Sequence, residues 1–200
     1  MSRVYKKQTH GHRHSFVSHA TALAGDRRVR QIVMHRLVEG EAHKHLRLEG
    51  SHTHGLHGCR KPLATCHHTL WIRQMDDLNR LAAMVHCLAQ RCHIPPTEAM
   101  GINLALEEMV ANVLSYAHPK SKKHSPSLLW MCRQGRHLTF VLVDDGIPFD
   151  PTTAPAADIS LPLEQRSIGG LGIHLTRQLT DSLHYRREGS FNMLTMTKTI

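Results

Sequence analysis

The sequence predicts an α+β fold, in which a mainly antiparallel sheet carries helices on one face, behind a largely disordered, histidine-rich extension. Most of the expected strands come in hairpin pairs, at residues 128–133 with 138–143 and at residues 183–187 with 193–198. Helices are few, and this combination favours an antiparallel sheet over a parallel one. The composition also changes near residue 68. We therefore divide the chain into an extension at residues 1–67 and a domain at residues 68–200.

The domain is expected to begin with a strand and two helices. Residues 69–74 form the predicted strand, and Asp76 is a suitable N-cap for the first helix. Apolar side chains then recur three and four positions apart, at Leu78, Leu81, Met84, Val85 and Leu88, as an amphipathic helix requires. The prolines at 95–96 end this helix and open a second one, which runs to about residue 117.

The second half of the domain is expected to contain two hairpins separated by a loop and a helix. A polar turn at residues 120–126 leads into the first hairpin, which turns around Gly135. Residues 145–168 form a loop so long that we expect it to cover a site. A helix then begins at the glycines of residues 169–172 and ends near residue 181. A hairpin that turns at residues 188–190 closes the chain.

The basic charge belongs to the extension. Residues 1–68 carry a net charge of +8 and 12 of the 19 histidines, whereas residues 69–200 carry a net charge of +1. The domain is therefore not expected to bind nucleic acid directly. The stretches HGHRH and HTHGLHGC leave metal binding open for the extension, and its charge leaves nucleic-acid binding open. We favour a disordered extension, or a start codon placed too far upstream, that is dispensable for nucleotide binding; only residues 29–38 are a candidate helix.

The expected location is the cytoplasm, without a membrane association. The chain contains no apolar run long enough for a transmembrane helix, and its basic N-terminus is not followed by the apolar region of a secretory signal. The five cysteines form no Cys-x-x-Cys pair and are odd in number, which favours reduced thiols.

The second predicted helix carries an unusual polar pair in the stretch LALEEMVANVLSYAHP. Glu108 and Asn112 are four residues apart and project side by side, whereas Glu107 lies about 100° away around the helix. A carboxamide beside a carboxylate can hold Mg²⁺ while the carboxylate takes a proton. Taken alone, the pair is better explained as a solvated helix face, because this spacing of glutamate and asparagine is common by chance.

Two further motifs follow in order. Asp144 and Gly146 come directly after an apolar strand, where the carboxylate is free to accept a hydrogen bond from a ligand, although an ordinary Asp-Gly turn has the same pattern. Residues 166–173, RSIGGLGI, place glycines at a helix start, where backbone N–H groups can approach a phosphate. A glycine-rich hinge is the plainer interpretation of that stretch.

Together, the three motifs resemble the nucleotide-binding boxes of the GHKL ATP-binding fold, which gyrase, MutL and histidine kinases share. The stretches DDGIPFDP at 144–151 and IGGLGI at 168–173 resemble the anti-sigma factor serine kinases of bacterial partner-switching systems, over roughly residues 68–200. The resemblance implies a two-layer α/β sandwich, the Bergerat fold. The extension lacks the long paired helices that bear the phosphorylated histidine of histidine kinases, so we exclude that branch.

The resemblance also implies roles for individual residues. Glu108 would be the general base, and Asn112 would ligate the Mg²⁺ that bridges the ATP phosphates. Asp144 would accept the adenine amino group, and Gly146 would allow the base to approach closely. The remaining nucleotide contacts would come from the loop, the helix start and the last strand, namely Arg166, Gly169, Gly170, Leu171, Gly172, Thr195 and Thr197.

The function implied by the resemblance is that of an ATP-dependent protein serine kinase that is also an anti-sigma factor. Such a protein binds a sigma factor and phosphorylates a STAS-type anti-anti-sigma protein on serine, with a PP2C-type phosphatase in the pathway. Members of the family form homodimers. The alternative is an ATP-binding partner-switching module without kinase activity, in which Glu108 only positions water.

Overall fold

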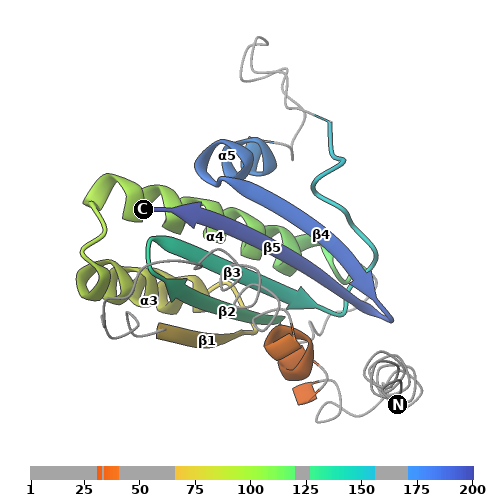
Figure 1. The fold of residues 1–200 in the computed structure, drawn as a ribbon. Coiled ribbons are helices and arrows are strands. Elements are labelled where there is room, and N and C mark those ends of the chain that lie inside the picture. Colours follow the sequence, from red (N-terminus) through yellow and green to blue (C-terminus); the bar gives the residue numbers. More distant parts are fainter. Residues whose placement is uncertain (1–30, 33, 41–65, 120–126, 156–170) are drawn as a thin grey trace, which may run out of the picture.

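The structure is a computed structural model that describes residues 31–32, 34–40, 66–119, 127–155 and 171–200 (Figure 1). The predicted polar turn at 120–126, and most of the extension, therefore lie outside the described residues. The strands are β1 (Cys66–Ile72), β2 (Ser127–Gln134), β3 (His137–Asp144), β4 (Ser182–Glu188) and β5 (Phe191–Thr199). The helices of the domain are α3 (Asp77–Cys92), α4 (Pro96–Tyr116) and α5 (Leu171–Leu179). The predicted strands and helices are all present, within a few residues of their expected bounds.

The five strands form one sheet in the order β1-β2-β3-β5-β4, and every neighbouring pair is antiparallel. Gly135 and Gly189 occupy the two hairpin turns with φ of 59° and 61°, in the left-handed region that glycine adopts without steric cost. The predicted antiparallel α+β architecture is confirmed.

Helices α3, α4 and α5 pack on one face of the sheet and form the main core with it (Figure 1). Side chains of the central strands alternate between the two faces, so Phe140 and Leu142 of β3 join this core while Val141 and Val143 point the other way. Asp77, which follows the N-cap residue Asp76, accepts the N–H groups of Arg73 and Gln74 at 2.7 and 3.2 Å. These bonds tie the start of α3 to the end of β1.

The second face of the sheet is also covered, which the prediction of helices on one face did not anticipate. Residues 31–32 and 34–40 are helical, as the candidate helix at 29–38 predicted, and Met34, Leu37 and Val38 pack against this second face. A signal for this is present in β2 and β3, because LLWMC and FVLV are continuous apolar runs, as expected for strands buried on both faces.

None of the helices in the described part of the chain is long and apolar enough to cross a membrane. Cys87 and Cys92 are free thiols.

Candidate nucleotide-binding site

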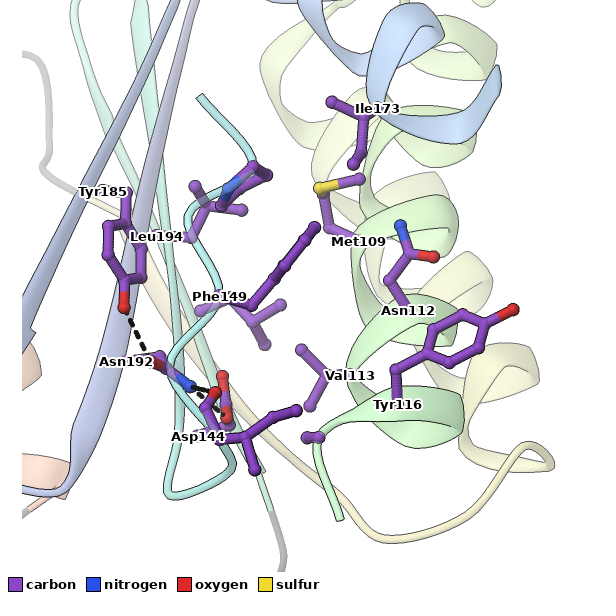
Figure 2. A pocket seen from close by; sticks show the side chains of 14 residues that line it. Met109, Asn112, Val113, Tyr116, Asp144, Phe149, Ile173, Tyr185, Asn192 and Leu194 are labelled. Carbon is purple, nitrogen blue, oxygen red and sulfur yellow. Dashed lines mark hydrogen bonds between the residues drawn. The ribbon is translucent and has the colours of Figure 1, made fainter. Parts of the chain in front are cut away.

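A cavity of about 260 Å³ lies between helix α4 and the ends of strands β3 and β5 (Figure 2). The loop after β3, Tyr185 of β4 and the first turn of α5 also border it. Its wall is largely apolar and contains Met109, Asn112, Val113, Tyr116, Ala117, Leu142, Asp144, Ile147, Phe149, Pro151, Ile173, Tyr185, Asn192 and Leu194. The structure therefore brings together Asn112 and Asp144, as the motifs predicted.

Asp144 is the buried acidic group of this cavity, with only 5% of its surface exposed. Its Oδ1 atom accepts hydrogen bonds from the N–H of Gly146 and from Nδ2 of Asn192, each at 2.8 Å. Burial raises the pKa of Asp144 above its ordinary value, and the nearby charge of Asp145 adds to that increase, whereas the two hydrogen bonds and His118 act in the opposite direction. The result is a carboxylate that readily accepts a further hydrogen bond.

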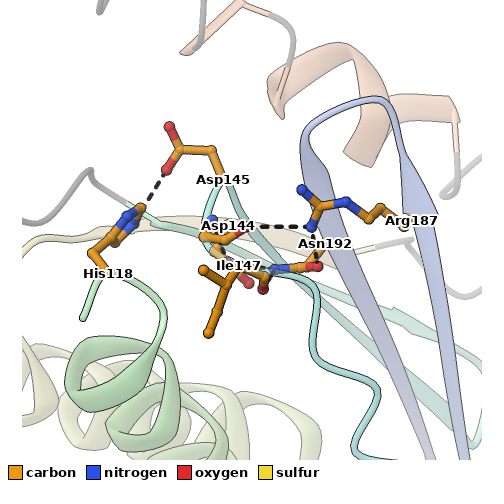
Figure 3. Close-up of polar contacts among 7 residues, drawn as sticks. His118, Asp144, Asp145, Ile147, Arg187 and Asn192 are labelled. Carbon is orange, nitrogen blue, oxygen red and sulfur yellow. Dashed lines mark hydrogen bonds and ion pairs between the residues drawn. The ribbon is translucent and has the colours of Figure 1, made fainter. Parts of the chain in front are cut away.

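Asn192 holds Asp144 in place, and the sequence analysis missed it. Its amide also donates to the carbonyl of Ile147 at 2.9 Å and accepts from Arg187 at 2.6 Å (Figure 3). The same amide accepts from the Tyr185 hydroxyl at 2.8 Å (Figure 2). Asn192 is directly opposite Asp144 in the β3–β5 register. The signal that could have found it is an asparagine at the start of the closing strand, but only a known register places it beside Asp144.

Gly146 is required by the packing of the protein itself. A Cβ atom at this position would lie 2.4 Å from Cβ of Ala117 and 2.7 Å from its carbonyl oxygen. That close approach lets the Ile147 N–H donate to the Ala117 carbonyl at 2.9 Å. Beside it, Nε2 of His118 lies 3.3 Å from Oδ1 of Asp145 (Figure 3). The loop after β3 is thus fastened to the C-terminal end of α4.

Helix α4 positions the predicted polar pair. The Asn112 amide points into the cavity (Figure 2) and makes no side-chain hydrogen bond with any other described residue. Glu108 does not line the cavity, because its carboxylate lies against the start of α5, where a Cβ atom added to Gly172 would be 2.1 Å from its Oε2 atom. Glu107 accepts a hydrogen bond from Asn103 at 2.9 Å and points elsewhere.

Only part of the predicted glycine-rich segment can be placed. Arg166, Gly169 and Gly170 lie outside the described residues. Leu171 is exposed at the first position of α5, and Gly172 contacts Glu108. The structure therefore brings Gly172 and Glu108 together next to the cavity.

Thr195 and Thr197 are not brought to the cavity. Thr195 is paired with Val141, whose side chain is on the second face of the sheet, and Thr197 is two residues further along the same face. Thr197 instead shares a 2.6 Å hydrogen bond with Ser182. The last strand contributes Asn192 and Leu194 to the cavity, since these residues alternate with the threonines.

The loop at residues 147–155 crosses the cavity as a fixed strap. Phe149 projects into the cavity from this strap, although about half of its surface is exposed (Figure 2). Arg177 of α5 donates to the carbonyls of Pro151 and Ala154 at 2.7 and 2.9 Å. Asp150 closes a turn by accepting the Thr152 N–H at 2.8 Å. These bonds hold the strap between the sheet and α5.

The arrangement suits a flat heterocycle that carries an amino group. The apolar walls can enclose the ring while the buried Asp144 carboxylate accepts the amino group. No group of three or more acidic, histidine or cysteine side chains that could hold a metal occurs among the described residues. The unpaired Asn112 amide fits Mg²⁺ as one oxygen ligand, because Mg²⁺ in nucleotide sites takes most of its ligands from phosphates and water.

Residues 73–198 match the family model described as the histidine kinase-like ATPase domain. A curated relative, the serine/threonine-protein kinase BtrW of Bordetella bronchiseptica, is 29% identical over 97 residues, which are 48% of this chain and 67% of the relative.

Two solved structures show lower sequence identity to this chain. The RsbU and RsbW domains of a Mycobacterium tuberculosis protein have a TM-score of 0.47 at 13% identity, over 70% of this chain and only 33% of that one. The SiaB–SiaC complex of Pseudomonas aeruginosa has a TM-score of 0.45 at 14% identity, over 78% of this chain and 97% of that one.

Proposed function

This chain belongs to the histidine kinase-like ATPase family, and from that premise we propose that it is an ATP-dependent protein serine kinase of a partner-switching system. The observation that carries the proposal is the buried Asp144 carboxylate, held by Asn192 and Gly146 in the wall of an apolar cavity. A carboxylate in this position selects the amino group of adenine, which guanine does not present at the same place. The similarity to a serine/threonine kinase supports the choice of reaction.

In this proposal, the apolar walls bind the adenine ring and Asp144 accepts its amino group. Phe149 and Ile147 of the strap exclude water from the ring. Asn112 faces the same cavity one helical turn before Tyr116 and contributes an oxygen ligand to Mg²⁺, which would neutralise charge on the phosphates. The phosphates extend towards the start of α5, where Gly172 offers no side chain to obstruct them.

Glu108 lies beside that helix start and is the proposed general base. The serine oxygen of the protein substrate forms the new bond to the γ-phosphorus, and the bond from that phosphorus to the ADP oxygen breaks. The serine proton passes to the ionised Glu108 carboxylate. Glu108 has no side-chain hydrogen bond to another described residue that would compete for this role.

The proposed protein substrate is a STAS-type anti-anti-sigma protein, and the proposed output partner is a sigma factor. A homodimer, a PP2C-type phosphatase in the same pathway and a cytoplasmic location are part of the same proposal. They are suggested by the sequence resemblance to anti-sigma kinases and by the relative's kinase activity. A second candidate is an ATP-binding switching module without kinase activity. It is favoured by one observation, that the Glu108 carboxylate lies outside the cavity that Asp144 and Asn112 line.

Two variants of the full chain test the proposal. Calorimetric titration with ATP and Mg²⁺ is expected to show binding by the wild type and its loss in Asp144→Asn, while GTP does not bind. Glu108→Gln is expected to keep ATP binding and to lose transfer of labelled phosphate to a STAS-type substrate. Transfer that survives in Glu108→Gln would favour another base, and ATP binding without transfer by the wild type would favour the switching module.

A further inference from the structure

The second face of the sheet is a continuous apolar surface. It contains Leu128 and Trp130 of β2, Val141 and Val143 of β3, and Phe191 and Met193 of β5. All six side chains are buried, although α3, α4 and α5 lie on the other face. Met34, Leu37 and Val38 pack against them from the helix formed by residues 31–32 and 34–40, hereafter helix 31–40, which comes from the segment before the matched family domain (Figure 1).

This helix has one apolar side and one charged side, as a helix packed on an apolar surface requires. Met34, Leu37 and Val38 are spaced three and four residues apart and are only 1%, 5% and 1% exposed. His35, Arg36 and Glu39 lie on the opposite side and are exposed, and Nδ1 of His35 is 3.7 Å from Oε1 of Glu39. The apolar stripe therefore faces the sheet and the charged side faces solvent.

We propose that helix 31–40 is a third layer of the folded unit, which occupies the second sheet face in cis and keeps it closed to a second copy of the chain. An uncovered apolar face of this extent is an association site, because monomeric proteins rarely expose one. A second copy presents the same face, and two such faces can meet about a two-fold axis. The partner that this face would otherwise take is therefore the chain itself.

The covalent connection through residues 41–65 favours the helix over the second copy. Tethered segments compete at an effective concentration on the order of millimolar, above the concentration that a regulatory protein reaches in solution. The folded unit then includes residues 31–32 and 34–40 as well as the matched family domain, and this face is not open to a second copy of the chain. The nucleotide cavity is on the opposite face, so loss of the helix leaves that cavity in place.

The two tryptophans report directly whether helix 31–40 shields the second face of the sheet. The chain has two of them; Trp130 is part of the covered surface, and Trp71 packs against the same surface from β1. Their emission and their quenching by acrylamide therefore report whether this face is shielded.

The experiment compares the full-length wild type with Met34→Asp/Leu37→Asp and with the matched control Ile32→Asp/His35→Asp. The control places the same number of aspartates in the same helix, but at positions that are exposed, since Ile32 is 52% exposed. Light scattering after size exclusion gives the mass at several protein concentrations, and acrylamide quenching gives the accessibility of the tryptophans. Cooperative unfolding by circular dichroism confirms that each variant is folded.

The wild type and the control are expected to keep one constant mass, with shielded tryptophans, at every concentration. In Met34→Asp/Leu37→Asp, we expect the quenching constant at high dilution to rise by roughly twofold or more as the rings become accessible. The mass should then double as the protein is concentrated, with the tryptophans shielded again.

Two results would overturn the proposal. The first is unchanged quenching in a folded Met34→Asp/Leu37→Asp variant, which would show that the helix does not cover the face in solution. The second is a variant with exposed tryptophans that keeps the wild-type mass at all concentrations, because the bared face would then have no affinity for a second copy.

Discussion

Replacing Asn192 by leucine is expected to weaken both the folded state and ATP binding. The Asn192 amide donates to Asp144 at 2.8 Å and to the Ile147 carbonyl at 2.9 Å, and it accepts from Tyr185 at 2.8 Å and from Arg187 at 2.6 Å. Leucine has a similar volume but makes none of these bonds. Four groups in or beside the cavity therefore lose a partner in one substitution.

The magnitude follows from the charge and burial of these partners. A hydrogen bond to an ionised group contributes about 1.5–3 kcal/mol, and a bond between neutral groups about 1 kcal/mol. Asp144 and Arg187 each keep a second partner, because the Gly146 N–H still donates to Asp144 and the Gly146 carbonyl still accepts from Arg187 at 3.2 Å. Bonds that share one amide are not additive. We expect the free energy of unfolding to fall by about 3 kcal/mol.

The effect on ATP binding comes through Asp144. Loss of the Asn192 donor raises the pKa of Asp144 further and removes the contact that orients its carboxylate. One misplaced hydrogen bond to a charged acceptor, at about 1.5–3 kcal/mol, corresponds to an affinity for ATP lower by roughly 10- to 100-fold. Urea denaturation and calorimetry on the full chain measure the two quantities.

Tyr185→Phe is the matched control, because it removes only one bond to Asn192 and leaves the contact between Asn192 and Asp144 intact. We expect it to cost about 1 kcal/mol of stability and to change the ATP affinity by less than about threefold. The reasoning would be refuted if Asn192→Leu lost stability but bound ATP as tightly as Tyr185→Phe. In that case Asn192 would support the sheet end without positioning Asp144.

Three further predictions concern the same cavity. Because burial raises the pKa of Asp144, ATP affinity should fall as the pH is lowered through that raised pKa, which calorimetry across pH measures. The contribution of Asp144 to the free energy of unfolding has the opposite dependence: it is present below the ordinary aspartate pKa and is lost as the pH rises through the raised pKa of the folded state, and Asp144→Ala should remove this pH dependence. Gly172→Ala places a methyl group 2.1 Å from Oε2 of Glu108, so the carboxylate must move. Phosphotransfer should then fall by roughly 100-fold while ATP affinity stays within about threefold of the wild type, and equal losses in both would contradict this. Arg177→Met frees the strap from the Pro151 carbonyl, and the ATP affinity should fall by roughly tenfold in titrations, with Arg177→Lys intermediate; an unchanged affinity would show that the strap holds without it.

Local patterns were sufficient to predict the elements and where Glu108, Asn112 and Asp144 lie on them. Apolar spacing predicted α3 and α4, and the glycine turns predicted both hairpins, because helical and strand periodicities and turn conformations are properties of short segments. The four-residue spacing of Glu108 and Asn112 places them on one side of α4 for the same reason. The acidic residue at the end of β3, Asp144, was likewise visible from its place after an apolar strand.

Which side chains meet depends on the tertiary structure. Asn192 reaches Asp144, and Thr195 faces away from the cavity, because the β3–β5 register assigns alternate residues to opposite faces, and a slip of one residue would exchange them. Gly146 is needed because Ala117, which lies far away in the sequence, occupies the space of its missing side chain. Residues 31–40 form a predictable amphipathic helix, but only the packed sheet shows which surface that helix covers. Short stretches of sequence specify the elements and their local chemistry, whereas contacts between distant segments depend on register and packing, which no short stretch of residues encodes.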